Sequence, residues 1–321
     1  MPTSPSLDQL RAAAEMVHAV MPPTPQYCWP LLSQRAGCEV WVKHENHTPI
    51  GAFKLRGGIV YMESLHRRDP SARGVIAATR GNHGQSVACA ATRAGLASTL
   101  VVPRGNSVEK NAAMRAFGAE LIEHGHDFQA ALEYARALAA ARGLHFVESF
   151  HDDLVHGVAS YGLEFLSACP DLARVYVPIG LGSGICGMIA ARDALGLGTE
   201  VIGVCAEGAP AYALSFARGE AVSTDAAETL ADGMACRVPE PAAVAVINRG
   251  AERMVTVGED EIKAAMRAYY SDTHNLAEGA GAAAFAALMR ERESLAGRKA
   301  GVVLSGGNID RPLYQAVLAE G

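Results

Sequence analysis

One lysine and three glycine-rich loops are the parts of this sequence that could carry chemistry. The lysine is Lys54, which stands beside Phe53 in "GAFKLRGG". A free lysine has a pKa of about 10.4, and an amine in a dry or cationic setting loses its proton more easily. Phe53 and the glycines could supply a tight, dry setting. Lys54 is therefore a candidate nucleophile or base, although a lysine at a helix start can also extend into solvent.

The loop "PIGLGSGICG" follows an apolar strand pattern and precedes a helix pattern. Its glycines at 180, 182 and 184 let backbone N–H groups approach a phosphate, and the helix N-terminus adds a favourable dipole. Ser183 adds a hydroxyl group. No Gly-Lys-Ser/Thr follows, so the loop is not a Walker A motif. It contains G-x-G-x-x-G, and Glu207 ends the next strand, so a nicotinamide-dependent dehydrogenase is an alternative. A tight turn without a ligand is another.

The loop "TRGNHGQS" follows the strand pattern "GVIAA". Gly81 allows a tight bend, and Asn82 and His83 open a helix whose free N–H groups can hold a carboxylate. Either residue alone has a simpler explanation, Asn82 as a helix cap and His83 as a structural hydrogen bonder. Their combination with two glycines and a glutamine favours a binding loop.

The loop "GVVLSGGNID" ends a buried strand at Ser305. A serine at the carboxyl end of a strand can meet a ring nitrogen or an amide, although an ordinary turn serine is an equal alternative for this stretch alone. One ligand would unite all four features. Pyridoxal phosphate has an aldehyde for the lysine amine, a phosphate for the glycine loop and a ring nitrogen for the serine.

Short Val- and Ile-rich runs alternate with longer Ala-rich helical patterns, and this predicts an α/β fold with parallel sheets flanked by helices. Ligands of such folds bind at the carboxyl ends of the strands. The loops at 70–74 and 150–153 are candidate crossings between two lobes. We therefore expect a large domain from residues 1–73 and 150–321, with a smaller domain, residues 74–149, inserted in it.

Composition restricts the class of protein. The 321 residues are half hydrophobic and carry a formal net charge of −6 without a basic run, which argues against nucleic acid as a partner. No secretory signal is recognised and no apolar run is long enough for a membrane helix, so we expect a cytoplasmic protein without a membrane partner. The seven cysteines are scattered without a C-x-x-C motif, and we expect them to be reduced.

The motifs together resemble a known family. "GAFKLRGG", "GNHGQ", the glycine loop, "TLADGMA", "EGAGA" and "LSGGNID" occur in the order found in fold type II pyridoxal phosphate enzymes, whose fold is like that of the tryptophan synthase β chain. The resemblance runs from about Thr24 to Asp310. It is nearest to the serine/threonine dehydratase and serine racemase branch, within it to a threonine dehydratase and hydroxyectoine-utilisation dehydratase subgroup.

The resemblance implies a role for each site residue. Lys54 carries the cofactor as a Schiff base and then acts as the base for the Cα proton, Phe53 packs near the ring, and the small domain is mobile and closes over the substrate. The remaining cofactor-binding residues are Asn82 at the ring hydroxyl, Gly180, Leu181, Gly182, Ser183 and Gly184 at the phosphate, and Ser305 at the ring nitrogen. The substrate-binding residues are Thr79, Arg80, Gly81, Asn82 and His83. Members are commonly homodimers.

The resemblance also implies β-elimination of a β-hydroxy amino acid such as L-threonine or L-serine, giving a 2-oxo acid and ammonia. A serine at the ring nitrogen makes the ring a weaker electron sink than an aspartate would, which suits elimination. The alternatives are 3-hydroxyaspartate or a bulkier substrate, and racemisation. Racemases of the family have a serine as second base where this chain has Arg80, a poor proton acceptor. A monovalent or divalent cation is left open, with Glu207 as candidate ligand, because Cys205 stands where the family's metal-binding glutamate is expected.

Overall fold

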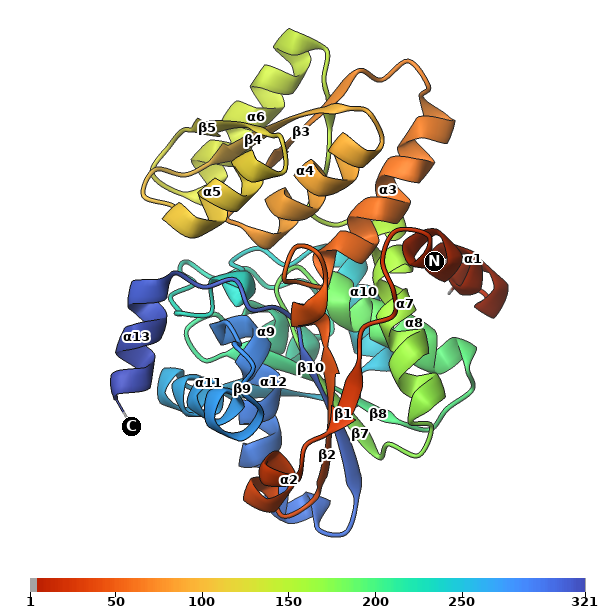
Figure 1. Cartoon of the computed structure of the whole chain (residues 1–321), viewed down its shortest axis with the longest axis vertical. Helices are drawn as coiled ribbons and strands as arrows, with labels where there is room; N and C mark the ends of the chain where they lie inside the picture. The colour runs from red at the N-terminus through yellow and green to blue at the C-terminus, as the bar shows by residue number, and fades with distance from the viewer. Residues whose placement is uncertain (1–4, 321) are drawn as a thin grey trace.

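The computed structural model describes residues 5–320, which form two lobes, each built on one β-sheet (Figure 1). The strands of the larger sheet are β1 (Gln26–Cys28), β2 (Glu39–His44), β7 (Arg174–Pro178), β8 (Glu200–Ala206), β9 (Arg253–Val257) and β10 (Lys299–Leu304). The strands of the smaller sheet are β3 (Gly74–Ala78), β4 (Ala97–Val102), β5 (Glu120–Glu123) and β6 (His145–Phe146). The strand orders are β1-β2-β10-β7-β8-β9 and β5-β4-β3-β6.

The predicted parallel sheets flanked by helices are confirmed, with one exception at an edge. All pairs of neighbouring strands are parallel apart from β1 and β2, which are antiparallel. Antiparallel pairing needs no long crossover, so the short helix between these two strands suffices as their connection. In β7, Val175 and Val177 enter one core and Tyr176 enters the other, as the two-residue period of a strand requires.

Helices cover both faces of each sheet. One face of the larger sheet packs against α1 (Leu7–His18), α7 (Asp152–Ala168), α8 (Ser183–Ala194) and α10 (Pro241–Gly250). The other packs against α2 (Pro30–Ala36), α11 (Glu259–Thr273), α12 (Gly279–Arg290) and α13 (Arg311–Ala319). In the smaller lobe α4 (Asn82–Arg93) and α5 (Val108–Ala116) cover one face and α6 (Phe128–Arg142) covers the other. The remaining helical segments are α3 (Lys54–Arg68), α9 (Ala211–Arg218), η1 (Glu45–His47), η2 (Asp232–Met234) and η3 (Arg292–Leu295).

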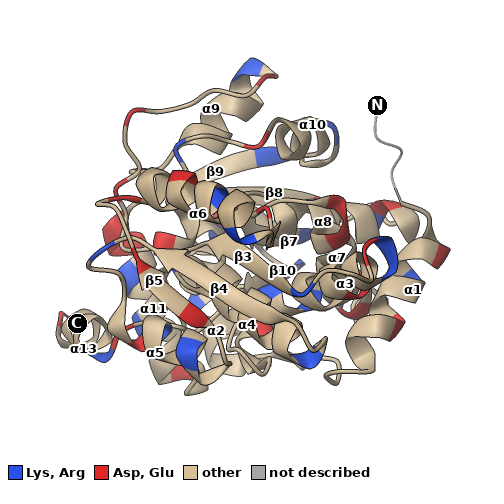
Figure 2. Ribbon diagram, turned by 90° about the horizontal axis from the view of Figure 1, so that it is seen from above, with Lys and Arg blue, Asp and Glu red and all other residues tan. Residues whose placement is uncertain are grey.

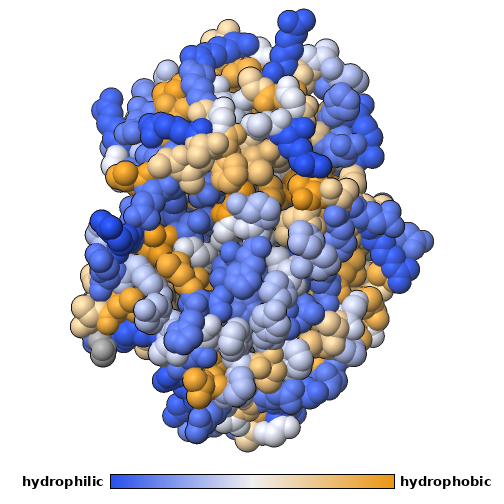
Figure 3. Space-filling model, in the orientation of Figure 1, coloured by the Kyte–Doolittle hydropathy of each residue, from blue (hydrophilic) through white to orange (hydrophobic). Residues whose placement is uncertain are grey.

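The four-stranded sheet is built from a continuous stretch of chain, from Gly74 to Phe146, that interrupts the larger lobe. Helix α3 packs against α4 of the smaller lobe and α7 of the larger one. Apolar side chains gather along the junction between the lobes on the face shown in Figure 3. The domain boundaries and the mobility of the small domain stay a prediction.

Basic and acidic residues are interspersed over both lobes, as the coloured ribbon in Figure 2 shows. No helix among residues 5–320 is long and apolar enough to cross a membrane. The structure pairs none of the seven cysteines in a disulfide, and five of them are buried.

A buried ion network, called the α3 network below, consists of Lys43, Glu45, Arg56 and Glu164. Arg56 on α3 is fully buried and donates hydrogen bonds to Glu45 Oε2 at 2.7 Å and to Glu164 Oε1 at 2.6 Å. Lys43 Nζ on β2 donates to Glu164 Oε2 at 2.5 Å. The network ties α3 to β2, η1 and α7. Because Lys54 is the first residue of α3, the network also fixes the position of that lysine.

Candidate active site

The chain before Lys54 lies beside the chain after β10, although the two are far apart in sequence. The Phe53 N–H donates to the Ser305 carbonyl oxygen at 3.0 Å, and the Gly307 N–H donates to the Gly51 carbonyl oxygen at 2.9 Å. Ser305 is 5 % exposed. Two of the sequence-predicted site residues, Lys54 and Ser305, are thereby brought together at the carboxyl end of the larger sheet.

Lys54 has the environment of a reactive amine. Its Nζ lies 4.6 Å from the centre of the Phe53 ring. Burial lowers the pKa of Lys54 to about 8, and the Glu278 carboxylate only partly offsets this. Lys54 as a whole residue is only partly buried. Lys54 therefore holds roughly two orders of magnitude more neutral amine at pH 7 than a free lysine does.

The glycine loop before α8 forms an anion cradle. Gly182 is the N-cap of α8 and has φ +98°, a left-handed conformation that glycine adopts readily. A side chain at Gly180 would place its Cβ 2.2 Å from the Gly233 carbonyl oxygen. No side chain caps the helix, and its first N–H groups have no acceptor among the described residues. Free donors at a helix start fit a phosphate group.

Two buried tyrosines orient this loop, and the sequence contained no signal for them. The Tyr212 hydroxyl donates to the Leu181 carbonyl oxygen at 2.8 Å, and the Tyr161 hydroxyl donates to the Gly184 carbonyl oxygen at 2.7 Å. In a trans peptide the C=O and the following N–H point in opposite directions. Fixing these two carbonyl groups therefore fixes the direction of the loop's N–H groups. Phe53 links this loop to Lys54, because a Cβ on Gly184 would lie 3.6 Å from Phe53 Cζ.

The start of α4 has two backbone N–H groups that are free to bind a ligand, in addition to those at the start of α8. The Thr79 hydroxyl oxygen accepts hydrogen bonds from the N–H groups of Gly81, at 3.0 Å, and Gly84, at 2.9 Å. The N–H groups of Asn82 and His83 lie between these two, and neither has an acceptor among the described residues. Thr79 thus shapes the turn, and the two free N–H groups suit a substrate carboxylate.

The side chains of Asn82 and His83 differ in how well they are satisfied. Asn82 Nδ2 donates to Glu278 Oε1 at 2.6 Å, and its Oδ1 accepts from Asn308 Nδ2 at 2.8 Å. An amide nitrogen has two hydrogens, so one stays available to a ligand. His83 Nε2 is buried without a hydrogen-bond partner. Burial and the nearby Lys54 lower the pKa of His83 to about 3, so this imidazole is neutral.

Three charged side chains that the sequence did not single out join these elements. Lys110 on α5 has its Nζ 2.5 Å from Asp232 Oδ2 and 3.5 Å from Glu278 Oε2. We call Lys110, Asp232 and Glu278 the cleft cluster. Burial raises the pKa of Glu278 to about 7, and Lys110 offsets only part of this. The two acids lie in "TLADGMA" and "EGAGA", stretches used only as signs of resemblance, and nothing local marked Lys110.

Arg80 and Glu207 lie on the surface. Arg80 is exposed, and its charge contributes, after the Ala130 N–H hydrogen bond, to lowering the pKa of Asp127. The exposed position of Arg80 favours a side chain that faces solvent over one that binds the substrate. Glu207 is also exposed and pairs with Arg290 Nη1 at 3.1 Å. Within residues 5–320 no group of three or more His, Cys, Asp or Glu side chains could hold a metal ion.

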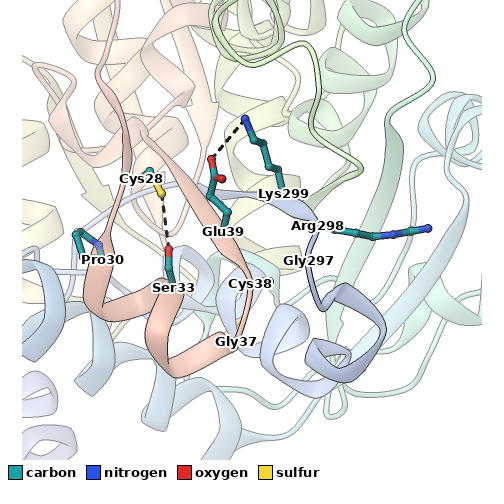
Figure 4. A pocket seen from close by; sticks show the side chains of 9 residues that line it. All are labelled: Cys28, Pro30, Ser33, Gly37, Cys38, Glu39, Gly297, Arg298 and Lys299. Atoms are coloured by element: carbon teal, nitrogen blue, oxygen red, sulfur yellow. Dashed lines mark hydrogen bonds and ion pairs between the residues drawn. The ribbon is translucent and has the colours of Figure 1, made fainter.

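A surface pocket lies at the opposite end of the larger sheet (Figure 4). It is lined by residues near the amino ends of β2 and β10, among them Cys38, Glu39 and Lys299. Ligands of parallel sheets bind at the carboxyl ends of the strands. The loops around Lys54, which follow those ends, are therefore the candidate active site.

Comparison with known proteins agrees with this geometry. Residues 19–306 match the family model described as "Pyridoxal-phosphate dependent enzyme". The chain belongs to this family. Its cofactor is pyridoxal phosphate, as the sequence predicted, and the free donors of the glycine loop and the amine of Lys54 fit that group. The nicotinamide-dependent alternative has no support from the match.

Relatives and solved structures narrow the branch of the pyridoxal-phosphate dependent enzymes. The chain is 33 % identical over 317 residues to the L-threonine ammonia-lyase of Thermotoga maritima, covering 98 % of this chain and 79 % of the relative. It is 28 % identical over 316 residues to the L-threo-3-hydroxyaspartate ammonia-lyase of Saccharomyces cerevisiae, covering 98 % and 97 %. The processed form of threonine deaminase isoform 2 from Solanum lycopersicum superposes with a TM-score of 0.89 at 29 % identity, covering 99 % and 95 %. A pyridoxal 5'-phosphate-dependent aspartate racemase superposes with a TM-score of 0.90 at 28 % identity, covering 97 % and 98 %.

These similarities confirm the predicted dehydratase and racemase branch, the fold type and the enzyme class. The printed names of both ammonia-lyase relatives agree with the predicted elimination chemistry, and the racemase neighbour agrees with the alternative. The roles of single site residues stay predictions.

Proposed function

We propose that this protein catalyses the β-elimination of a β-hydroxy amino acid such as L-threonine or L-serine, releasing a 2-oxo acid and ammonia. The position of Lys54 carries the proposal. Its amine has a lowered pKa, its neighbour Phe53 borders the start of α8, and its carbonyl oxygen accepts a hydrogen bond from Ser86 of α4 at 2.7 Å. Lys54 therefore lies beside two helix starts that can each hold an anion.

The residues around Lys54 divide the work of binding. Pyridoxal phosphate, when bound, supplies an electron-withdrawing ring that acidifies the Cα–H of the amino acid. Lys54 would hold the cofactor covalently and, once released, take the Cα proton. The loop 180–184 would hold the phosphate, Ser305 the ring nitrogen, and the free Asn82 hydrogen the ring hydroxyl. Phe53 would border the ring.

The start of α4 would receive the α-carboxylate of the substrate. The N–H groups of Asn82 and His83 are free for it, in the turn that Thr79 and Gly81 shape. The exposure of Arg80 supports threonine or serine over 3-hydroxyaspartate, because no permanent cation from that position faces a second carboxylate. It also supports elimination over racemisation, which needs a second base on the opposite face of Cα.

The covalent role of Lys54 can be tested directly. The purified protein should be yellow, and borohydride reduction should attach the cofactor to the peptide that contains Lys54. Lys54→Ala should abolish release of 2-oxo acid. Lys263→Ala, on the surface of α11 where the lysine pairs with Glu320, is the matched control and should keep full activity. Attachment to any other lysine would contradict the assignment.

A substrate screen tests the reaction. We expect 2-oxo acid release from L-threonine or L-serine, weaker release from L-threo-3-hydroxyaspartate, and little D-serine from L-serine. Formation of D-serine at a rate comparable to that of pyruvate would favour the racemase alternative instead.

We also propose that the protein is a cytoplasmic homodimer, as the family resemblance suggests. Light scattering of the purified protein tests its mass, and fractionation of the source cells tests its location. A monomer, or recovery with the membrane fraction, would refute the respective part.

A further inference from the structure

The cleft cluster contacts the two anion-binding loops of the proposed site. A Cβ on Gly81 would lie 2.4 Å from Lys110 Cδ, so the stem of this lysine packs directly against the substrate loop. Asp232 precedes Gly233, whose carbonyl oxygen closely approaches Gly180 of the phosphate loop. The cluster therefore spans the space between the two loops.

Glu278 is fixed in this space at its backbone and at one carboxyl oxygen, and the other carboxyl oxygen accepts no hydrogen bond. Its backbone N–H donates to the Gly306 carbonyl oxygen at 3.1 Å, and its Oε1 accepts from Asn82. Oε2 is buried and has no hydrogen-bond partner among the described residues, although Lys110 Nζ is 3.5 Å away. Buried carboxyl oxygens are normally bonded, and a protonated carboxyl has an O–H to donate.

From this placement we infer that Glu278 is a further catalytic residue, the acid that protonates the β-hydroxyl group as it leaves, with Lys110 and Asp232 as its positioning residues. The inference rests on the proposed function, because it assigns the second proton of the same elimination. A β-hydroxyl group is a poor leaving group unless it receives a proton.

The proton balance closes within the site. The Lys54 amine takes the Cα proton, and the electron pair of that bond becomes the second bond between Cα and Cβ. The Cβ–O bond breaks, and the departing oxygen takes the proton of Glu278 and leaves as water. Lys54 is then cationic and Glu278 anionic, so they attract each other. Transfer of the proton from Lys54 to Glu278 restores both groups.

The charges around Glu278 are consistent with an acid that works near neutral pH. Burial raises its pKa to about 7, Lys110 on α5 opposes this and Asp232 on η2 adds to it. Lys54 on α3 is a further cation that interacts electrostatically with this carboxyl group, since the charge of Glu278 raises the pKa of Lys54. His83 also lies close enough to Lys54 to be affected by its charge, and with a pKa of about 3 its imidazole is neutral at pH 7 and therefore a very weak acid.

Leaving groups of different basicity test the inference. L-Threonine loses hydroxide and needs the acid, whereas β-chloro-L-alanine loses chloride, which needs no proton. For Glu278→Gln we expect kcat on L-threonine to fall by about 10²- to 10⁴-fold, the usual contribution of a general acid, while kcat on β-chloro-L-alanine changes by less than about threefold. Glu291→Gln, the same substitution at the other end of α12, is the matched control and should affect neither substrate.

Wild-type enzyme provides a test that needs no variant. The ratio of kcat on L-threonine to kcat on β-chloro-L-alanine should fall as pH rises through the pKa of Glu278, because only the L-threonine reaction needs the protonated carboxyl group. Ionisations that affect both substrates equally cancel in this ratio. Lys110→Met should move this fall to higher pH, since it removes the cation that favours the carboxylate. The protonation of Glu278 can also be measured without cofactor. Infrared spectra of the apoprotein at pH 6 should contain the carbonyl band of a protonated carboxyl group, and Glu278→Gln should remove this band.

Three results would overturn the assignment. Equal losses on both substrates in a folded Glu278→Gln protein would mean that Glu278 only maintains the site. Unchanged rates on both would remove it from the reaction, and a pH-independent ratio in the wild type would do the same. If wild-type enzyme releases 2-oxo acid from neither substrate, the proposed function itself fails, which is a different outcome from any of these.

Discussion

The α3 network and the cleft cluster are both buried groups of acids and cations, and they lie on either side of Lys54. In the α3 network Glu164 accepts hydrogen bonds from Arg56 and Lys43, and the cation charge balances the acid charge. In the cleft cluster Lys110 faces two acids, and Glu278 keeps an oxygen without a bond. A fully satisfied network gives rigidity, whereas a partly satisfied one leaves a group free to react.

The two glutamates show the difference in their pKa values. Burial would raise the pKa of Glu164, but the charges and hydrogen bonds of Arg56 and Lys43 outweigh it and lower the pKa to about 2. Burial also raises the pKa of Glu278, and the charge of Lys110 offsets only part of this effect, so the pKa is about 7. The number of donors, and not the residue type, decides which glutamate stays ionised.

The largest effect on stability is expected from breaking the α3 network. Arg56→Met leaves Glu45 and Glu164 buried without their cation, and should lower the free energy of unfolding by about 3–5 kcal/mol. Arg142→Met is the control, because it removes a cation from an ion pair with Glu120 in which both side chains are exposed, and it should cost at most about 1 kcal/mol. Urea unfolding measures both. Similar decreases in the free energy of unfolding in the two variants would show that the α3 network stabilises the fold no more than a surface ion pair does.

The two clusters should give stability opposite dependences on pH. The lowered pKa of Glu164 contributes stability that is present above its unfolded pKa of about 4.3 and is lost as pH falls toward 2. The raised pKa of Glu278 contributes stability below about pH 4.3 that is lost as pH rises through 7. Glu278→Gln should therefore reduce the loss of stability between pH 5 and pH 8, by on the order of 1–3 kcal/mol. Unfolding curves at pH 3, 5 and 8 test this, and an unchanged difference between pH 5 and 8 would refute it.

A smaller effect is expected from the hydroxyl that orients the phosphate loop beside the cleft cluster. Tyr212→Phe removes the bond to the Leu181 carbonyl oxygen, worth about 0.5–1.5 kcal/mol, so cofactor binding to apoprotein should weaken by roughly two- to tenfold. Tyr269→Phe is the control, because the Tyr269 hydroxyl is buried without a partner. Titration of apoprotein with cofactor measures both affinities. If the two variants bind alike, Tyr212 does not orient the loop.

The smallest effect is expected from Arg80, the cation next to the substrate loop that belongs to neither cluster. Because it is exposed, Arg80→Ala should change kcat/KM for L-threonine and for L-threo-3-hydroxyaspartate by no more than about twofold. Equal larger losses would show that Arg80 binds the α-carboxylate. A selective loss for hydroxyaspartate would show that it recognises the second carboxylate.

Local patterns in the sequence determined much of this protein. Alternating strand and helix periods predicted the parallel sheets. Glycines at 180, 182 and 184 marked the proposed anion-binding loop, and the setting of Lys54 marked the proposed reactive amine. These features depend on neighbouring residues, because a strand, a helix start or a left-handed turn is specified within a few positions.

Tertiary structure alone decided which of these groups meet and how they are charged. Residues 110, 232 and 278 come from three distant segments, so no local pattern could show that they form one cluster. The tyrosines that hold the phosphate loop and the outward direction of Arg80 were undetermined for the same reason. The pKa values of Lys54 and Glu278 depend on burial and on the distance to other charges. Both quantities exist only once the chain has folded, because folding removes water and brings distant charges close.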